Sequence, residues 1–397
     1  MNLHPVIFGP GEDPDVTPDS GIALCLGGGG FRSMLFHLGV IVRLNECGWL
    51  GKITLYSSVS GGSITAAMLG FKWRHLHFDE SGVAGNLLRE VAQPLMTFAR
   101  GTIDLPAFVV GVLPFTSPAR ELAAAYSSRL FGDATLQSLP DEATAPRFLL
   151  QATSLQTCAL WQFSRDSMGD ETVGLIPSPQ LKLATAVAAS SAYPPLLSPL
   201  KLKLHEDDFD PATAGANYAP PYTRLAVLSD GGIQDKLAMA TAWKACRTVL
   251  VSDASATTAT KSDLSSDWVT MSLRIATITE NRTAALHKRQ LMLALQTGLR
   301  QGAYWGIRSD IRNYELDDAL ICPLPETRQL ADIPSRYAAL SQATINRLVN
   351  WGYAICDAAM RKHVDPKIAH PAKVPFQQAG AAYHHIAPKR SASNSGA

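Results

Sequence analysis

Three short glycine-containing segments hold the residues whose types and spacing suit chemistry. They read GGGGFR at 27–32, SVSGG at 58–62 and SDGG at 229–232. Glycine N–H groups at the start of a helix can hold an anion, such as a phosphate or the oxyanion of an acyl-transfer intermediate. A nucleophilic serine often stands at a sharp turn from strand to helix. Its neighbours in the sequence are then small, because the turn is crowded. An Asp between an apolar strand and two glycines directs a carboxylate out of the sheet edge, although Asp-Gly is also a common turn.

Ser60 is the candidate nucleophile of the second segment. Ser57 and Ser58 fall inside a predicted strand, and Ser63 falls inside the helix that follows it. Only Ser60 stands at the junction of the two with a glycine directly after it. The alternative for this segment is a Ser/Gly helix cap without chemistry.

Each of the three segments follows a predicted strand. Apolar runs predict strands at 21–26, 53–59, 147–153, 160–163, 225–229 and 248–252, and helical spacing predicts helices at 34–50, 63–73 and 181–191. Alternating strands and helices indicate a parallel sheet flanked by helices. Sheets of this kind bind ligands at the carboxyl ends of their strands, so the three segments are expected to meet at one edge.

The same segments argue against nucleotide and nucleic-acid binding. A P-loop needs Gly-Lys-Ser/Thr after the glycines, and residues 31–33 read FRS. A dinucleotide fingerprint needs an acidic residue near the end of the next strand, and that strand ends in serines. The formal net charge is +1 and no basic run occurs, so no nucleic-acid partner is predicted.

In these motifs the sequence resembles the patatin-like phospholipases. Four blocks carry the resemblance in the family's order: GGGFRS at 28–33, SVSGG at 58–62, ASSAYP at 189–194 and DGG at 230–232. Two positions depart from the family pattern. Ser58 replaces the first glycine of the nucleophile motif, and Ser33 replaces the glycine after the arginine. Both changes exchange one small residue for another.

The resemblance implies a fold and an activity. The implied fold is a three-layer α/β/α sandwich of patatin type with a mainly parallel central sheet and a helical C-terminal extension. The implied activity is that of a serine lipid acyl hydrolase, which cleaves carboxylic esters of phospholipids or lysophospholipids through a Ser–Asp dyad. Ser60 would attack the acyl carbonyl and Asp230 would act as the base, while the N–H groups of Gly28, Gly29 and Gly30 would form the oxyanion hole. This chemistry needs no metal or cofactor.

Several alternatives remain open at this point. Arg32 could orient the glycine loop, meet a lipid phosphate or form a structural ion pair. A conventional triad would need a histidine late in the chain, and His363, His370, His384 and His385 are the candidates. A catalytically silent binding or regulatory protein on the same scaffold is the competing hypothesis, although such proteins usually lose the serine or the aspartate.

Composition divides the chain into regions. We expect an irregular lead-in at 1–20, a catalytic domain at 21–262 with a helical lid or insert at 75–140, a helical extension at 263–380 and a disordered tail at 381–397. The charge-free stretch from Leu105 to Phe115 is the candidate for a lid or a peripheral membrane contact, with core packing as the alternative.

The remaining features concern the compartment. The six cysteines have no metal-type or paired spacing, which favours free thiols in a reducing compartment. Neither a signal peptide nor a transmembrane run is visible, so a cytoplasmic protein is expected, with membrane contact at most peripheral. Nothing in the sequence indicates the oligomeric state.

Overall fold

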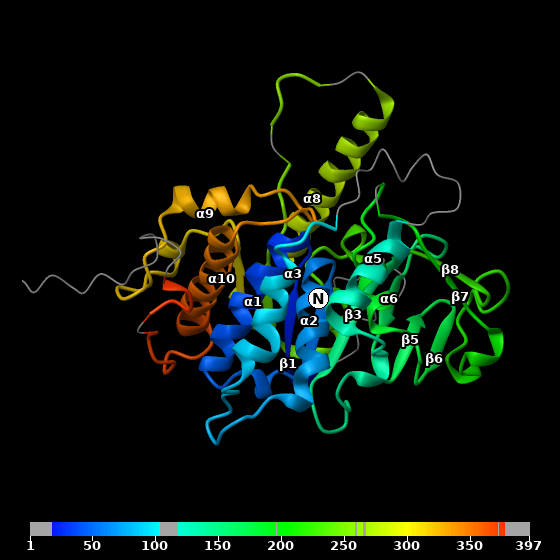
Figure 1. Cartoon of the computed structure of the whole chain (residues 1–397), viewed down its shortest axis with the longest axis horizontal. Coiled ribbons are helices and arrows are strands. Elements are labelled where there is room, and N and C mark those ends of the chain that lie inside the picture. Colours follow the sequence, from blue (N-terminus) through cyan, green and yellow to red (C-terminus); the bar gives the residue numbers. More distant parts are fainter. Residues whose placement is uncertain are drawn as a thin grey trace, which may run out of the picture.

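One mixed sheet runs through the computed structural model of the chain, which describes residues 18–103, 118–195, 197–258, 260–264, 267–371 and 373–377. Within these residues the sheet has ten strands, and eight follow one another in the order β10-β9-β1-β2-β3-β4-β5-β6. The other two, β7 and β8, join it beside β3. Helices flank this sheet (Figure 1), so the predicted α/β sandwich is confirmed.

The parallel strands form the half of the sheet that carries the first two glycine segments. They are β10 (Gln301–Gly306), β9 (Cys246–Asp253), β1 (Asp19–Leu26), β2 (Leu55–Val59) and β3 (Arg147–Ser154). Sheets that are covered on both faces read as uninterrupted apolar runs, which is why most of these strands could be predicted. The predicted mainly parallel central sheet is therefore confirmed. One parallel strand, β10, was not predicted and lies within the C-terminal region.

The antiparallel strands extend the sheet on the other side of β3. They are β4 (Leu160–Phe163), β5 (Ser167–Asp170), β6 (Gly174–Pro177), β7 (Leu200–Lys203) and β8 (Leu225–Asp230). Three of them, β5 to β7, were not predicted: β5 and β6 contain glycine and β7 contains two lysines, so none has the apolar run that marks the equally short β4.

Two strands meet end to end along one edge of β3. At this edge β2 runs parallel to β3 and its last residue, Val59, pairs with Gln151. The next residue of β3, Ala152, pairs with Asp230, the last residue of the antiparallel strand β8. The other edge of β3 is occupied by β4. Because β2 and β8 approach from opposite directions, the residues at their ends are brought face to face.

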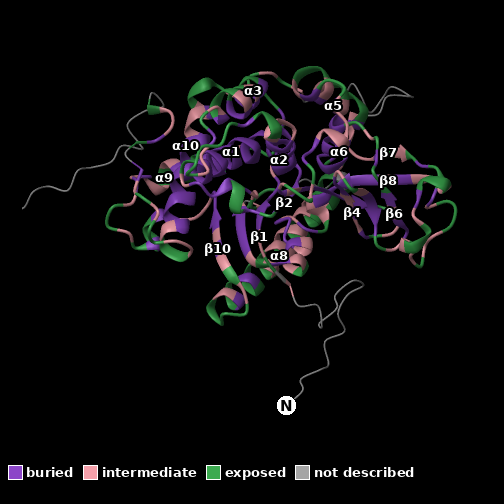
Figure 2. Cartoon of the chain, turned by 90° about the horizontal axis from the view of Figure 1, so that it is seen from below, coloured by how far each residue is buried: buried purple, intermediate pink, exposed green. Residues whose placement is uncertain are grey.

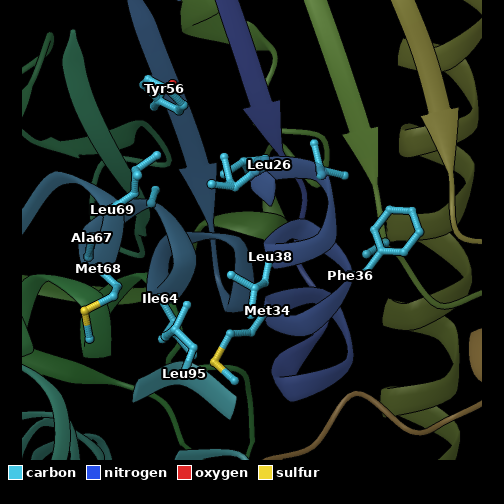
Figure 3. Packing of buried hydrophobic residues seen from close by; sticks show 14 of the residues in the cluster. Leu26, Met34, Phe36, Leu38, Tyr56, Ile64, Ala67, Met68, Leu69 and Leu95 are labelled. Carbon is cyan, nitrogen blue, oxygen red and sulfur yellow. The ribbon is translucent and has the colours of Figure 1, made fainter. Parts of the chain in front are cut away.

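The larger core lies on one face of the sheet, under α1 (Gly30–Glu46), α2 (Gly61–Lys72) and α10 (Gln342–His363). Figure 3 shows Leu26 from β1 beside Leu38 and Met34 from α1. These residues are all fully buried. The glycine loop and the Ser60 turn thus rest on densely packed elements and not on free loops.

The smaller core lies on the opposite face of the sheet. Here Ala23 and Cys25 of β1 pack with Ala242 of α7 (Ala240–Ala245) and Leu291 of α8 (Trp268–Gln296). Figure 2 shows α8 on the side of the sheet away from α1 and α2. Together the two cores give the helix–sheet–helix order of an α/β/α sandwich.

The C-terminal helix α10 packs closely against α1. A Cβ on Gly39 would lie 1.9 Å from the carbonyl oxygen of Val349, and a Cβ on Gly352 would lie 1.9 Å from that of Phe36. Such glycine contacts let two helix backbones approach directly. The chain after residue 263 therefore shares the core of the preceding residues, and it adds β10 to their sheet.

The region 75–140 combines helices with turns and loops where the structure describes it. It contains α3 (Gln93–Phe98), α5 (Pro118–Tyr126) and two π-helical turns. The stretch from Leu105 to Phe115, the candidate for a lid or a peripheral membrane contact with core packing as the alternative, lies outside the described residues. Among the described helices, none has both the length and the apolarity to cross a bilayer. None of the six cysteines, all of which lie within the described residues, forms a disulfide.

Candidate active site

Ser60 occupies the sharp turn between β2 and α2. Its backbone lies at φ 53° and ψ −128°. A non-glycine residue at positive φ is strained, and nucleophile elbows are sites where such strain is held. The glycine after it is required, because a Cβ on Gly61 would lie 2.1 Å from the carbonyl oxygen of Gly30. The turn predicted at Ser60 is thus present, pressed against the glycine loop.

The other serines near Ser60 have their hydroxyls engaged elsewhere. Ser57 donates to the Ala238 carbonyl oxygen at 2.7 Å, and Ser58 donates to the Leu149 carbonyl oxygen at 3.0 Å. The Ser63 hydroxyl donates to that of Ser58 at 3.1 Å. The serine that replaces the family's first glycine is therefore accommodated by hydrogen bonds to β3 and α2.

Asp230 ends β8 opposite Ser60 and is buried. Its Oδ1 accepts a hydrogen bond from the Gly232 N–H at 2.8 Å, and its Oδ2 has no partner of normal geometry among the described residues. Burial raises the pKa of this carboxyl to about 6, although hydrogen bonds with Ser60 and Gly232 lower it. The carboxyl thus has one oxygen fixed and the other available for a proton, with a pKa near neutral.

The ASSAYP block at 189–194 holds both candidate residues by their backbones. The Ser60 N–H donates to the Ser190 carbonyl oxygen at 3.1 Å and to the Ser190 hydroxyl at 3.0 Å. The Asp230 N–H donates to the Ala192 carbonyl oxygen at 2.9 Å. The ASSAYP block therefore sets the spacing between the SVSGG and DGG blocks.

The glycine loop lies directly against Ser60. A Cβ on Gly28 would be 3.0 Å from the Cβ of Ser60 and 3.7 Å from its hydroxyl oxygen. The Gly28 N–H donates to the Lys236 carbonyl oxygen at 3.3 Å, whereas the N–H groups of Gly29 and Gly30 donate to no other described residue. Two of the three predicted donors are thus available to an anion in this structure.

A buried histidine supports the loop, and sequence analysis did not single it out. His37 on α1 contacts the Gly27 carbonyl oxygen through Nε2 at 2.7 Å and the Ser252 hydroxyl through Nδ1 at 2.8 Å. Burial lowers the pKa of His37 to about 4, so the ring is neutral near pH 7. Since a carbonyl only accepts, Nε2 carries the proton and donates to Gly27.

A segment from the C-terminal region crosses the glycine loop. We call residues 332–340 the strap; it connects α9 (Leu324–Ala331) with α10. The Arg336 carbonyl oxygen accepts from the Phe31 N–H at 3.1 Å, and a Cβ on Gly30 would lie 2.6 Å from the same oxygen. Gly30 has φ 63°, so both its conformation and this close approach exclude a side chain.

Arg32 fastens the strap to the loop. Its guanidinium is buried and donates to the carbonyl oxygens of Ala331, Ile333 and Ala254 and to the Ser335 hydroxyl. No carboxylate forms an ion pair with it among the described residues. Burial lowers the pKa of Arg32 to about 10. These contacts favour the orienting role over the ion pair and over contact with a lipid phosphate, which would need an exposed side chain.

The strap also brings Tyr337 to the candidate dyad. Burial and the nearby Asp230 together raise the pKa of Tyr337 to about 12, although hydrogen bonds with Ser191 and Ser60 act in the opposite direction. Its ring packs edge-on against Phe31, with centroids 5.4 Å apart. Tyr337 could not be predicted from the sequence, because it follows no predicted strand and belongs to no motif. Its position depends on chain packing across about three hundred residues.

The late histidines take no part in the contacts of Ser60 and Asp230 that the structure describes. His363 packs edge-on against Tyr314. His370 lies near Asp318, a carboxyl whose pKa is lowered mainly by its hydrogen bond with Arg361 and to a smaller extent by His370. His384 and His385 lie outside the described residues. Within those residues, no group of three or more His, Cys, Asp or Glu side chains is arranged to hold a metal ion.

Comparisons with known proteins point to one family. The family model described as patatin-like phospholipase matches residues 24–243, which is more than half of the chain. Among curated proteins, none matches the sequence closely enough to count as a relative.

Solved structures of low sequence identity also align with the chain. Human GIVD cytosolic phospholipase A2 in complex with methyl gamma-linolenyl fluorophosphonate aligns at a TM-score of 0.48 and 14% identity, over 85% of this chain and 57% of that one. VipD from Legionella pneumophila aligns at a TM-score of 0.32 and 16% identity, over 84% of this chain and 67% of that one. The chain therefore spans less than two thirds of the length of the human enzyme.

Proposed function

Because the chain belongs to the patatin-like phospholipase family, we propose that it hydrolyses carboxylic esters of phospholipids or lysophospholipids through Ser60 and Asp230. One observation carries this proposal. Ser60 sits in a strained elbow opposite a buried carboxyl whose pKa is raised to about 6. A structural serine or a turn-forming aspartate has no need of either feature, and each has a cost in stability.

The first half of the reaction needs one proton acceptor. The Ser60 hydroxyl oxygen attacks the acyl carbonyl carbon, and its proton passes to Oδ2 of Asp230, the oxygen with no partner of normal geometry among the described residues. The carbonyl π bond breaks, and its electron pair becomes the oxyanion. When the oxyanion collapses, the bond to the alcohol breaks, and Asp230 returns the proton to the leaving oxygen.

The second half repeats the sequence with water. Asp230 removes a proton from water as the water attacks the acyl-serine, and the proton returns to Ser60 when the fatty acid leaves. The oxyanion of both steps would accept hydrogen bonds from the Gly29 and Gly30 N–H groups. Gly28 would contribute a third donor only if it left the Lys236 carbonyl oxygen. Removing one such donor from an oxyanion hole typically slows catalysis by ~10²–10³.

The proposal is tested with a fluorophosphonate probe, which reacts with activated serines. Wild-type protein should be labelled, and Ser60→Ala should not be labelled. Ser63→Ala is the matched control, because Ser63 lies three residues further on and its hydroxyl is engaged with Ser58 and Ser190. Labelling that persists in Ser60→Ala, or a wild type that neither reacts nor hydrolyses any ester lipid, would overturn the proposal and favour a silent binding protein.

A further inference from the structure

Helix α8 carries an apolar stripe that faces away from the rest of the molecule. We call Trp268, Ile275, Leu286 and Leu293 the α8 stripe; they are 79, 59, 62 and 62% exposed. Their spacing places all four within about 20° of one line along the helix. Figure 1 shows the first half of α8 standing clear of the other elements. Side chains of this size gathered on one exposed line usually mark an interaction surface.

The middle of α8, at Glu280, lies at the rim of the candidate active site. The Tyr193 hydroxyl is 3.5 Å from Oε2 of Glu280, which is also 3.9 Å from Nζ of Lys236. Tyr193 follows Ala192, whose carbonyl oxygen accepts the Asp230 N–H. Glu280 and Lys236 both act on the pKa of Asp230, one raising it and the other lowering it. Glu280 is on another face of α8 from the stripe, so a surface that contacts the stripe lies near the candidate active site but across this helix from it.

The charges of α8 distinguish the occupants that could cover the stripe. The helix contains four basic residues and a single acidic one, Glu280, which is turned toward Lys236. Arg282 and Arg289 are exposed on the stripe side and form no ion pair within the described part of the chain. Two copies packed stripe to stripe would bring these arginines together without an acidic partner. An anionic surface would instead be attracted by them.

We propose that the α8 stripe docks on an anionic lipid surface and keeps the candidate active site close to the layer that contains its substrate. This role rests on the proposed lipid hydrolysis, whereas the docking itself does not. Interfacial helices combine apolar side chains, often including Trp, with basic residues at the edge of the buried face, as α8 does. The stripe is also independent of the stretch from Leu105 to Phe115.

The test measures flotation with vesicles of phosphatidylcholine, with and without phosphatidylserine. The stripe variant combines Ile275→Asp with Leu286→Asp. The matched control combines Leu88→Asp with Leu155→Asp, two leucines that are 46 and 47% exposed elsewhere on the molecule. The stripe variant should bind phosphatidylserine vesicles at least about tenfold more weakly than the control, because two acidic groups replace apolar ones at the interface. Both variants should turn over a soluble short-chain ester at the wild-type rate.

The outcomes separate docking from catalysis. Docking is overturned if the stripe and control variants float equally, or if wild-type protein floats with neither vesicle. Equal flotation with both compositions overturns the anionic preference. A wild-type dimer in light scattering that the stripe variant loses would overturn docking in favour of a second copy. A wild type that floats but hydrolyses no ester leaves docking intact and contradicts only the proposed function.

Discussion

The two strands that end at the candidate dyad hold their functional side chains in different ways. At the end of β2, Ser60 is held by local geometry: a positive φ, a glycine after it and neighbouring serines that are already hydrogen-bonded. At the end of β8, Asp230 is held by its environment, since burial raises its pKa to about 6. Backbone strain thus distinguishes the candidate nucleophile, whereas burial of a carboxyl distinguishes the candidate base.

Removing the charge of Asp230 should abolish most activity and increase stability. We expect Asp230→Asn to lower kcat/KM on a soluble ester by about 10²–10⁴, the usual contribution of a general base. The stability that protonated Asp230 contributes is fully present below its ordinary pKa of 3.8 and is lost as the pH rises through about 6. At pH 8 the variant, which carries no charge, should therefore be more stable than wild type by up to roughly 3 kcal/mol.

Urea unfolding at pH 4 and pH 8 measures this stability difference. The advantage of the variant should shrink toward pH 4, where wild-type Asp230 is largely protonated. A variant that is inactive and also less stable at pH 8 would show that the carboxylate has a structural role. The claim that the buried charge of Asp230 destabilises the fold would then be wrong.

The pH dependence of wild-type activity should follow the same carboxyl. Because the base must be ionised, kcat/KM should rise about tenfold per pH unit up to about 6 and then level off. Between pH 4 and pH 8 the expected change is about a hundredfold. Measuring initial rates on an uncharged short-chain ester excludes titration of the substrate. A profile that levels off near pH 4 would mean that burial does not raise the pKa of Asp230 in solution.

Detaching the strap from the glycine loop should lower both the stability of the fold and the activity. Arg32→Ala removes donors to Ala331, Ile333 and Ser335, so the strap would lose its attachment to the glycine loop. We expect a loss of roughly 2–4 kcal/mol in the free energy of unfolding and a larger fractional loss of kcat than of substrate affinity. Arg308→Ala is the control, because its guanidinium also donates to the Ala331 carbonyl oxygen but is more exposed. Equal losses in the two variants would remove the special role of Arg32.

Tyr337 tests whether the strap acts on the chemistry directly. Tyr337→Phe removes one hydroxyl that interacts with Ser60 and Ser191 but keeps the ring against Phe31. We expect kcat to fall about fivefold to tenfold, the effect of one neutral hydrogen bond, with little change in unfolding. Unchanged kcat would assign Tyr337 to packing alone.

The contrast between the locally determined turn at Ser60 and the tertiary environment of Asp230 explains which features could be predicted from the sequence. The turn at Ser60 could be predicted because its requirements are local: a short apolar strand, small neighbours and a following glycine. The role of Asp230 could be inferred only through the family pattern, because an Asp-Gly turn has no local sign of burial. The head-on meeting of β2 and β8 could not be predicted, since it depends on the antiparallel pairing of β8 with β3. Tyr337 and His37 also escaped prediction, because only tertiary packing brings them to the loop.

The smallest expected effect concerns the residue that departs from the family pattern. Ser58→Gly restores the glycine but removes the hydrogen bond to the Leu149 carbonyl oxygen and the acceptor of the Ser63 hydroxyl. If strain at Ser60 is held by the backbone alone, kcat/KM should stay within about twofold of wild type, and unfolding should become easier by about 1 kcal/mol. Ser57→Gly is the matched control one residue earlier in β2, where the lost bond goes to Ala238. A large loss of activity in Ser58→Gly alone would show that the serine network, and not only the backbone, prepares the nucleophile.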